Sequence, residues 1–389
     1  METLILGWYV LTVTGSVQQL VVFAALAWVG TVFSPFIGAA SDRVGVRTLL
    51  CLTRGAYALL AAVLAVLALS GALAPWHVFA IAALGGLIRP SDMGLRQVLI
   101  GQTIRPEMLI GALGISRTTQ DTAKVGAALA GTAGVALIGI GAAYLVVTLM
   151  YASAFLLSLG VARSPRSPKH SGDAEKGTVA AAKLGVLADV KAALPYVWHK
   201  PELLAAISMA FLINLLAFPF GMGLLPYAAK EVFAVGQAGL GYLAAAFSIG
   251  ALLGSVVVSA GGLPQHASRV MICAGAAWFV AMLLFGQTRT LELGILFLFV
   301  AGFVQSFCVT TLAAVLLRGA PDHMRGRVVG LRMLAVWGLP LGLLIAGPTI
   351  ARLGFSATTL IYCGLGFALT LAIGYRWRHT LWHRPGSPP

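Results

Sequence analysis

A series of long apolar runs constrains this chain more than any other feature. A run of about 20 apolar residues is long enough to cross the bilayer core, which is roughly 30 Å thick, as a single α-helix. Only 10% of the 389 residues are charged, and the mean hydropathy is +0.93. A single soluble core cannot bury so much apolar surface, and disordered chains have the opposite composition. The chain is therefore predicted to be an all-α membrane protein.

The apolar runs fall into two sets, separated by a stretch rich in Lys, Ser and Pro at 163–200. We expect an N-terminal helical bundle at 1–162, a cytoplasmic linker at 163–200, a C-terminal bundle at 201–375 and a cytoplasmic tail at 376–389. The runs lie at 3–13, 17–39, 49–69, 76–101, 110–138 and 141–161, and then at 203–225, 238–260, 270–285, 291–317, 328–353 and 355–375.

The positions of the basic residues predict the orientation. Among the 26 Lys and Arg, only Lys230, Arg289 and Arg352 fall in loops on one side, whereas the loops on the other side are rich in basic residues. Because cytoplasmic loops carry the excess of Lys and Arg, both termini and the linker are predicted to be cytoplasmic. The location is then the inner or plasma membrane, with many crossings. The net charge of +14 resides in these loops, so nucleic acid is not an expected partner.

The two sets of runs contain a short internal repeat. Pro106, Gly111 and Arg117 recur with the same spacing as Pro321, Gly326 and Arg332, each time at the start of a fifth run. Duplicated helical units of this kind are typical of transporters whose substrate site lies between the halves. The repeat also predicts that the first helix, at 3–13, is incomplete at its N-terminus. Either the start codon was assigned too late or the protein is truncated.

A loop between the second and third runs carries a recognisable motif, Gly38-Ala-Ala-Ser-Asp-Arg-Val-Gly-Val-Arg47. It resembles the signature loop of the major facilitator superfamily, G-x3-D-R-x-G-x-R, and six runs, a basic linker and six runs is also the layout of that superfamily. The resemblance implies twelve helices in two pseudo-symmetric six-helix bundles, with the first helix incomplete here. Gly7-Trp8-Tyr9 and Arg325-Gly326-Arg327 are similar to the enterobactin-exporter-like group within it.

Each position of this loop has a physical reason. Gly38 allows a close helix approach, and Gly45 allows a tight turn. Asp42 would cap the free N–H groups of the following helix. Arg43 and Arg47 can form pairs across the two halves. By resemblance, these five residues form a conformational latch in one of two alternating states; the other interpretation is a merely basic loop that sets topology.

Six ionisable side chains lie on the fourth and fifth helices, at the depth of the membrane. A charge there costs roughly 2.5–3.5 kcal/mol, so such residues are usually functional. Their spacing places each group of three on one helix face. The predicted substrate and proton pathway contains Arg89, Asp92, Asp121 and Lys124, with a cytoplasmic gate of Arg96, Arg117 and Arg332.

Two interpretations of these charges remain open. In the first, they line a positive, water-filled pocket for an anionic or zwitterionic substrate, and Asp92 or Asp121 takes up a proton. In the second, Arg89–Asp92 and Arg117–Asp121 are structural ion pairs within their helices. Asn214, Gln305 and Thr310 are weaker candidates that either line the cavity or form interhelical hydrogen bonds.

The sequence contains no phosphate-binding loop, zinc-binding helix motif or nucleophile elbow, so we expect no cofactor, no metal site and no enzyme. The predicted function is secondary-active export of a small organic compound by alternating access, with protons as possible partners besides the substrate and the bilayer. The alternatives are an uptake permease of the same fold and a sensor or scaffold that has lost transport. The antiporter motif of the fifth helix is incomplete: Gly126-Ala127 stands where Gly-Pro is expected.

Overall fold

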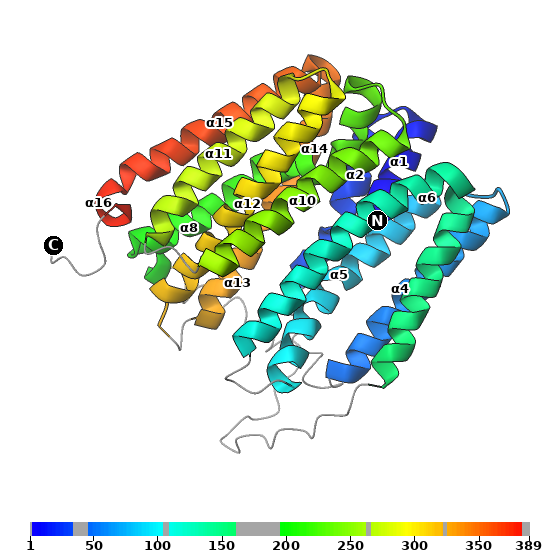
Figure 1. Ribbon diagram of the computed structural model, residues 1–389, viewed down its shortest axis with the longest axis horizontal. Coiled ribbons are helices and arrows are strands. Elements are labelled where there is room, and N and C mark those ends of the chain that lie inside the picture. Colours follow the sequence, from blue (N-terminus) through cyan, green and yellow to red (C-terminus); the bar gives the residue numbers. More distant parts are fainter. Residues whose placement is uncertain are drawn as a thin grey trace. The chain divides into compact units, whose positions relative to one another are not determined.

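The computed structural model describes residues 2–33, 46–103, 109–160, 195–261, 266–321 and 325–382. All regular elements in these ranges are helices (Figure 1). The prediction of an all-α fold is confirmed.

The first set of apolar runs forms five helical stretches. They are α1 (Glu2–Thr14), α2 (Val17–Leu26) with the 3-10 turn η1 (Val29–Phe33), α4 (Val46–Leu69), α5 (Pro75–Thr103) and α6 (Leu109–Leu159). α6 contains both the fifth and the sixth predicted helix, because Gly139 has φ 78° and ψ 166° and interrupts the helix. The sequence placed the loop between these helices at this position.

The second set begins with α8 (Pro201–Leu212) and continues through the π-helical turns η3 (Ile213–Ala217) and η4 (Pro219–Gly223), the short α9 (Leu225–Tyr227) and the π-helical η5 (Ala228–Val232). Regular helices follow: α10 (Gln237–Gly261), α11 (Ala267–Gln287), α12 (Leu291–Gly319), α13 (Arg325–Ala335), α14 (Gly338–Leu353), α15 (Phe355–Arg376) and the short α16 (Arg378–Leu381).

Seven helices within the described ranges are long and apolar enough to cross a membrane. Shorter apolar helices are found at Glu2–Thr14, Val17–Thr31, Pro75–Arg89 and Pro201–Ala217. The seven candidate spans are Arg47–Leu69, Thr118–Leu159, Gln237–Gly261, Ala267–Gln287, Leu291–Gly319, Leu331–Leu353 and Phe355–Arg376.

The chain divides into two compact units. The first contains Met1–Ala25, Arg117–Leu137 and Ala192–Pro389, and the second contains Leu26–Ser116 and Ile138–Lys191. The proposed bundle boundaries at 162 and 201 stay a prediction.

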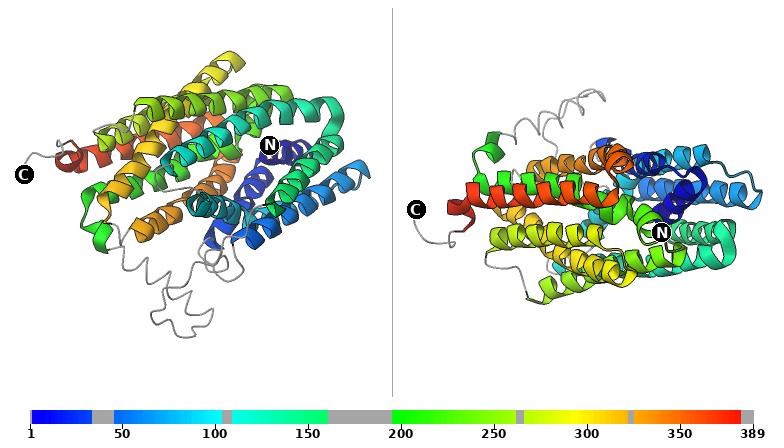
Figure 2. Two further views of the ribbon diagram at one scale, coloured as in Figure 1. Left: turned by 60° about the horizontal axis from the view of Figure 1, so that its bottom comes forward. Right: turned by 90° about the horizontal axis from the view of Figure 1, so that it is seen from above.

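Long helices lying side by side form much of the first unit. α12 lies along α10 and α11, and α15 lies along α11 (Figures 1 and 2). Gly250 permits the close approach of α10 and α12, since a Cβ atom on it would lie 2.0 Å from the carbonyl oxygen of Phe299. Gly254, one turn later, allows a similar approach, since a Cβ atom on it would lie 2.5 Å from the carbonyl oxygen of Phe303.

The stretch from α8 to η5 is irregular, as Pro219, Gly221 and Pro226 predict. The N–H of Leu224 donates to the carbonyl of Pro219, five residues earlier, over 2.9 Å. The N–H of Phe233 makes the same kind of bond to Ala228 over 3.0 Å. These bonds define π-helical turns, which occur frequently at functional sites.

The second unit packs α4 and α5 against each other and α5 against η1. The phenol ring of Tyr57 stacks on that of Tyr151 with centroids 5.3 Å apart, and its hydroxyl donates to the carbonyl of Gly85 over 3.1 Å. Tyr57 therefore ties α4 to α5 and to the second half of α6.

Candidate functional site

The strongest polar feature of the described residues is an ion pair on α6. Nζ of Lys124 lies 2.8 Å from Oδ1 of Asp121, and the two residues are three positions apart on the helix. The side chain of Asp121 is only 2% exposed, whereas that of Lys124 is 54% exposed. The carboxylate is therefore fixed inside the protein, and the ammonium group extends from it toward the surface.

α6 packs closely against α10 on the C-terminal side of Asp121. A Cβ atom on Gly241 would lie 2.0 Å from Oγ1 of Thr132 and 3.1 Å from the carbonyl oxygen of Ala128. The Thr132 hydroxyl avoids burial without a partner by donating to the Ala128 carbonyl over 2.7 Å. At this crossing the helices approach as closely as their backbones and small side chains allow.

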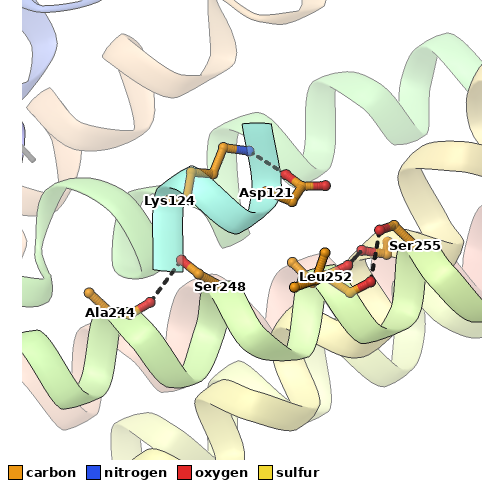
Figure 3. A network of polar contacts seen from close by, with 8 residues as sticks. Asp121, Lys124, Ala244, Ser248, Leu252 and Ser255 are labelled. Atoms are coloured by element: carbon orange, nitrogen blue, oxygen red, sulfur yellow. Dashed lines mark hydrogen bonds and ion pairs between the residues drawn. The ribbon is translucent and has the colours of Figure 1, made fainter. Parts of the chain in front are cut away.

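Figure 3 draws the ion pair together with two serines of α10. The two helices run in opposite directions, with Lys124 on the side of Ser248 and Asp121 on the side of Leu252 and Ser255 (Figure 3). The hydroxyls of Ser248 and Ser255 donate to the carbonyls of Ala244 and Leu252, over 2.9 and 2.8 Å. Their oxygen atoms retain lone pairs that can accept a hydrogen bond from an ammonium group or a solute.

These two serines are not among the residues predicted from the sequence. A signal was available, because Gly241, Ser248 and Ser255 are spaced seven residues apart and therefore share one face of α10. Small residues on one face are typical of a membrane helix contact, and hydroxyls on that face add polarity to it.

Arg89 lies in a different environment, within the second unit. Its guanidinium carbon is 5.1 Å from the ring centroid of Trp28, the residue just before η1. A glycine crossing positions the two side chains: a Cβ atom on Gly30 would lie 2.0 Å from the carbonyl oxygen of Gly86, less than one turn before Arg89. The aromatic face stabilises the cation electrostatically. Trp28 also escaped the sequence analysis, since nothing in the local pattern indicates this contact.

The remaining members of the charged cluster are only partly described. Asp92, Arg96 and Arg117 lie in the helical backbones of α5 and α6, but their side chains fall outside the described residues. Arg332 is half-buried in α13. Asp121 forms an ion pair with Lys124, three residues later, and the predicted pair of Asp121 with Arg117 falls outside the described side chains.

The three weaker cavity candidates are all half-buried on helices of the first unit. The amide of Asn214 donates to the carbonyl of Ala210, one turn back, over 2.8 Å. Gln305 and Thr310 lie on α12, where the hydroxyl of the neighbouring Ser306 donates to the carbonyl of Ala251 on α10 over 2.6 Å. Their predicted role as cavity lining stays a prediction.

Most of the predicted latch lies outside the described residues, namely Gly38, Asp42, Arg43 and Gly45. Arg47 is described at the start of α4, where its guanidinium donates to the carbonyl of Leu159 at the end of α6. This bond joins two helix ends within the second unit.

Metal ligands do not cluster in the described part of the chain: no group of three His, Cys, Asp or Glu side chains is suitably placed. On α5 and α6 the described polar chemistry includes the buried carboxylate of Asp121, the cations Arg89 and Lys124 and a few hydroxyls. These side chains can bind a charged solute, and the carboxylate can take up or release a proton.

A chain with seven described helices long and apolar enough to cross a membrane, some of them carrying charged side chains, is typical of a polytopic membrane protein. Residues 3–343 match the Major Facilitator Superfamily, and the chain belongs to that family. It is therefore a membrane transporter of the twelve-helix fold class, which confirms the resemblance found in the sequence.

The relatives include both sequences and solved structures. The multidrug efflux pump Tap of Mycolicibacterium fortuitum is 28% identical over 367 residues, covering 91% of this chain and 86% of that protein. A variant of the nucleoside transporter NupG superimposes with a TM-score of 0.73 at 14% identity, covering 96% of this chain and 94% of that one. The human organic anion transporter MFSD10 gives a TM-score of 0.64 at 19% identity, with coverages of 91% and 83%. These structural likenesses show the fold alone.

Proposed function

We propose that this protein is a secondary-active exporter of small organic compounds that are anionic or zwitterionic. The observation that carries the direction is the match to an efflux pump, at 28% identity along 91% of the chain. Export then proceeds by alternating access, with the substrate exposed first to one side of the membrane and then to the other.

The charges on α5 and α6 support this substrate class. Arg89 and Lys124 both lie on membrane-embedded helices, and each would cost roughly 2.5–3.5 kcal/mol to insert without compensation. Lys124 is half-exposed while its carboxylate partner is buried, so its ammonium group can turn toward a solute without leaving Asp121. A carboxylate or phosphate on the substrate is the natural partner for these cations.

Asp121 is our candidate for the proton-binding residue. Protonation would remove its negative charge and free Lys124 from the ion pair. A zwitterion that brings its own ammonium group to Asp121 competes with the proton, and competition for one site is what exchange of substrate for protons requires. A substrate with only negative charge binds Lys124 best when Asp121 is protonated. Such a substrate and the proton would therefore cross the membrane in the same direction.

The loop around Asp42 is proposed to act as the conformational latch, with Gly38, Arg43, Gly45 and Arg47. Arg47 contributes a bond between the ends of α4 and α6.

We place the protein in the inner or plasma membrane with both termini in the cytoplasm, because the basic residues concentrate in the loops on that side. Cysteine labelling from outside intact cells at Arg352 and at His199 tests this orientation: only the cysteine at position 352 should react.

Flux measurements in proteoliposomes test the function. A panel of organic anions, zwitterions and cations is loaded, and efflux is followed with and without an opposing proton gradient. We expect efflux of zwitterions driven by proton entry, movement of anions in the same direction as protons, loss of coupling in Asp121→Asn, and full flux in Arg352→Gln, a change of an exposed cation at the end of α14. Accumulation inside the vesicles would favour an uptake permease, and absence of flux across the whole panel would favour a non-transporting protein.

A further inference from the structure

An apolar groove of about 660 Å³ opens on the surface of the first unit, between α8, α13 and α15. Large apolar side chains line it, and three of them are well exposed: Phe211 is 39%, Leu334 47% and Leu369 38% exposed. Its volume lies within the range of roughly 300–1,000 Å³ that is common for small-molecule sites.

One end of the groove coincides with the end of the membrane-spanning helices. Arg376, the last residue of α15, and Trp377 line the groove at this end. Trp198, just before α8, lines it as well. From this end to Phe211 the groove extends along about ten residues of α8, roughly 15 Å at 1.5 Å per residue. Trp and Arg at the end of a span, with apolar side chains deeper in, match the change from headgroups to acyl chains in a bilayer leaflet.

The charge at this end is mainly positive. Residues 195–202 and 375–382 carry Lys200, Arg376 and Arg378, with Glu202 as their single acidic side chain. Arg376 and Arg378 are exposed, and the guanidinium of Arg378 lies 4.8 Å from the ring centroid of Tyr375. Clusters of basic residues next to a membrane span attract anionic lipid headgroups.

We propose that this groove binds one anionic phospholipid, with an acyl chain along Phe211, Leu334 and Leu369 and its phosphate at Arg376. The apolar length of the groove matches an acyl chain, and the cationic end complements the headgroup. The chain spans a membrane, so the exposed apolar walls face a supply of such molecules. The site is separate from the Asp121–Lys124 pair on α6 and does not depend on the direction of transport.

Native mass spectrometry of the purified full-length protein tests the proposal by titration with phosphatidylglycerol and, separately, phosphatidylcholine. Arg376→Gln should weaken the first phosphatidylglycerol binding step about fivefold, which corresponds to the ~1 kcal/mol that one basic residue contributes near an anionic surface. Ala372→Phe should weaken it at least as much, because Ala372 lines the groove and a ring there would fill it.

Matched controls exist for both variants. Arg352→Gln removes an exposed cation from the far end of α14, and Ala368→Phe adds the same ring to an exposed alanine of α15 that does not line the groove. Both should bind phosphatidylglycerol like the unchanged protein. Equal binding of phosphatidylcholine, or no effect of Ala372→Phe, would overturn the proposal. So would loss of a bound lipophilic dye, but not of lipid, in Ala372→Phe, since the groove would then admit hydrophobic solutes.

Discussion

Two helix crossings of the molecule belong to helices that carry a charged residue, and the surroundings of that residue differ between them. At the crossing of α5 with η1, backbone meets backbone through Gly30 and Gly86, and Arg89 beside it lies over the ring of Trp28. At the crossing of α6 with α10, Gly241 meets the side chain of Thr132, and Asp121 is buried with Lys124 as its counter-ion. At the first crossing no side chain lies between the backbones and could move aside. At the second crossing the side chain of Thr132 could.

The largest effect is expected at the backbone crossing. A Cβ atom on Gly86 would lie 2.2 Å from the carbonyl oxygen of Leu26, so Gly86→Ala must separate the two backbones. Overpacking typically costs about 1–3 kcal/mol, and here we expect at least about 3 kcal/mol because no side chain can yield. The folded fraction after detergent extraction, followed by size-exclusion fluorescence, measures it. Gly85→Ala, whose nearest contact would be 3.8 Å away, serves as control and should fold normally.

The second effect should be smaller and reversible. Gly241→Ala brings a methyl group against the hydroxyl of Thr132, which costs about 2 kcal/mol. Removing that hydroxyl in the double variant with Thr132→Ala should recover most of the loss in thermal unfolding midpoint. If the double variant is no more stable than Gly241→Ala, contact with the Ala128 carbonyl controls the crossing and the contrast with Gly86 disappears.

The third prediction concerns the ion pair and its unequal burial. Lys124→Gln leaves a carboxylate that is 2% exposed without this ammonium group, whereas Asp121→Asn leaves a lysine that is 54% exposed and can reach other partners. Because removing the counter-ion of a buried charge costs more than removing that of an exposed one, Lys124→Gln should destabilise the protein by about 1.5 kcal/mol more than Asp121→Asn. Thermal unfolding in one detergent compares them; the reverse order would show that Asp121 is held mainly by other contacts.

The smallest effect is expected for the aromatic contact. Trp28→Leu keeps apolar bulk but removes the π face above which Arg89 lies, at a cost of about 0.5–1 kcal/mol. Trp28→Phe retains a ring and should lie between the two. Unfolding midpoints of the three proteins test this order, and a Phe variant equal to the Leu variant would show that bulk alone matters.

The sequence predicted the helices well and their partners poorly. Apolar length located the spans, Gly139 marked a loop, and Pro219 marked an irregular helix, because each acts on its own segment. The contact of Arg89 with Trp28 and the burial of Asp121 depend on which helices cross and in what register. Helix pairing and register are set by close approaches such as that of Gly86 to the carbonyl oxygen of Leu26, and a single sequence does not show which residues approach one another.

The π-helical turns after α8 have a mechanical consequence. Each such turn, like the one closed by the bond from Leu224 to Pro219, contains one residue more than an α-helical turn. If one of them rewinds to α-helix, every residue beyond it rotates about the axis by one residue's angle, about 100°. Tyr227 and Lys230 would then swing to a new face while Asn214, before the turn, stayed in place. The extra residue of each π-helical turn thus allows the rest of the helix to rotate about its axis without a hinge and without unwinding of the helix.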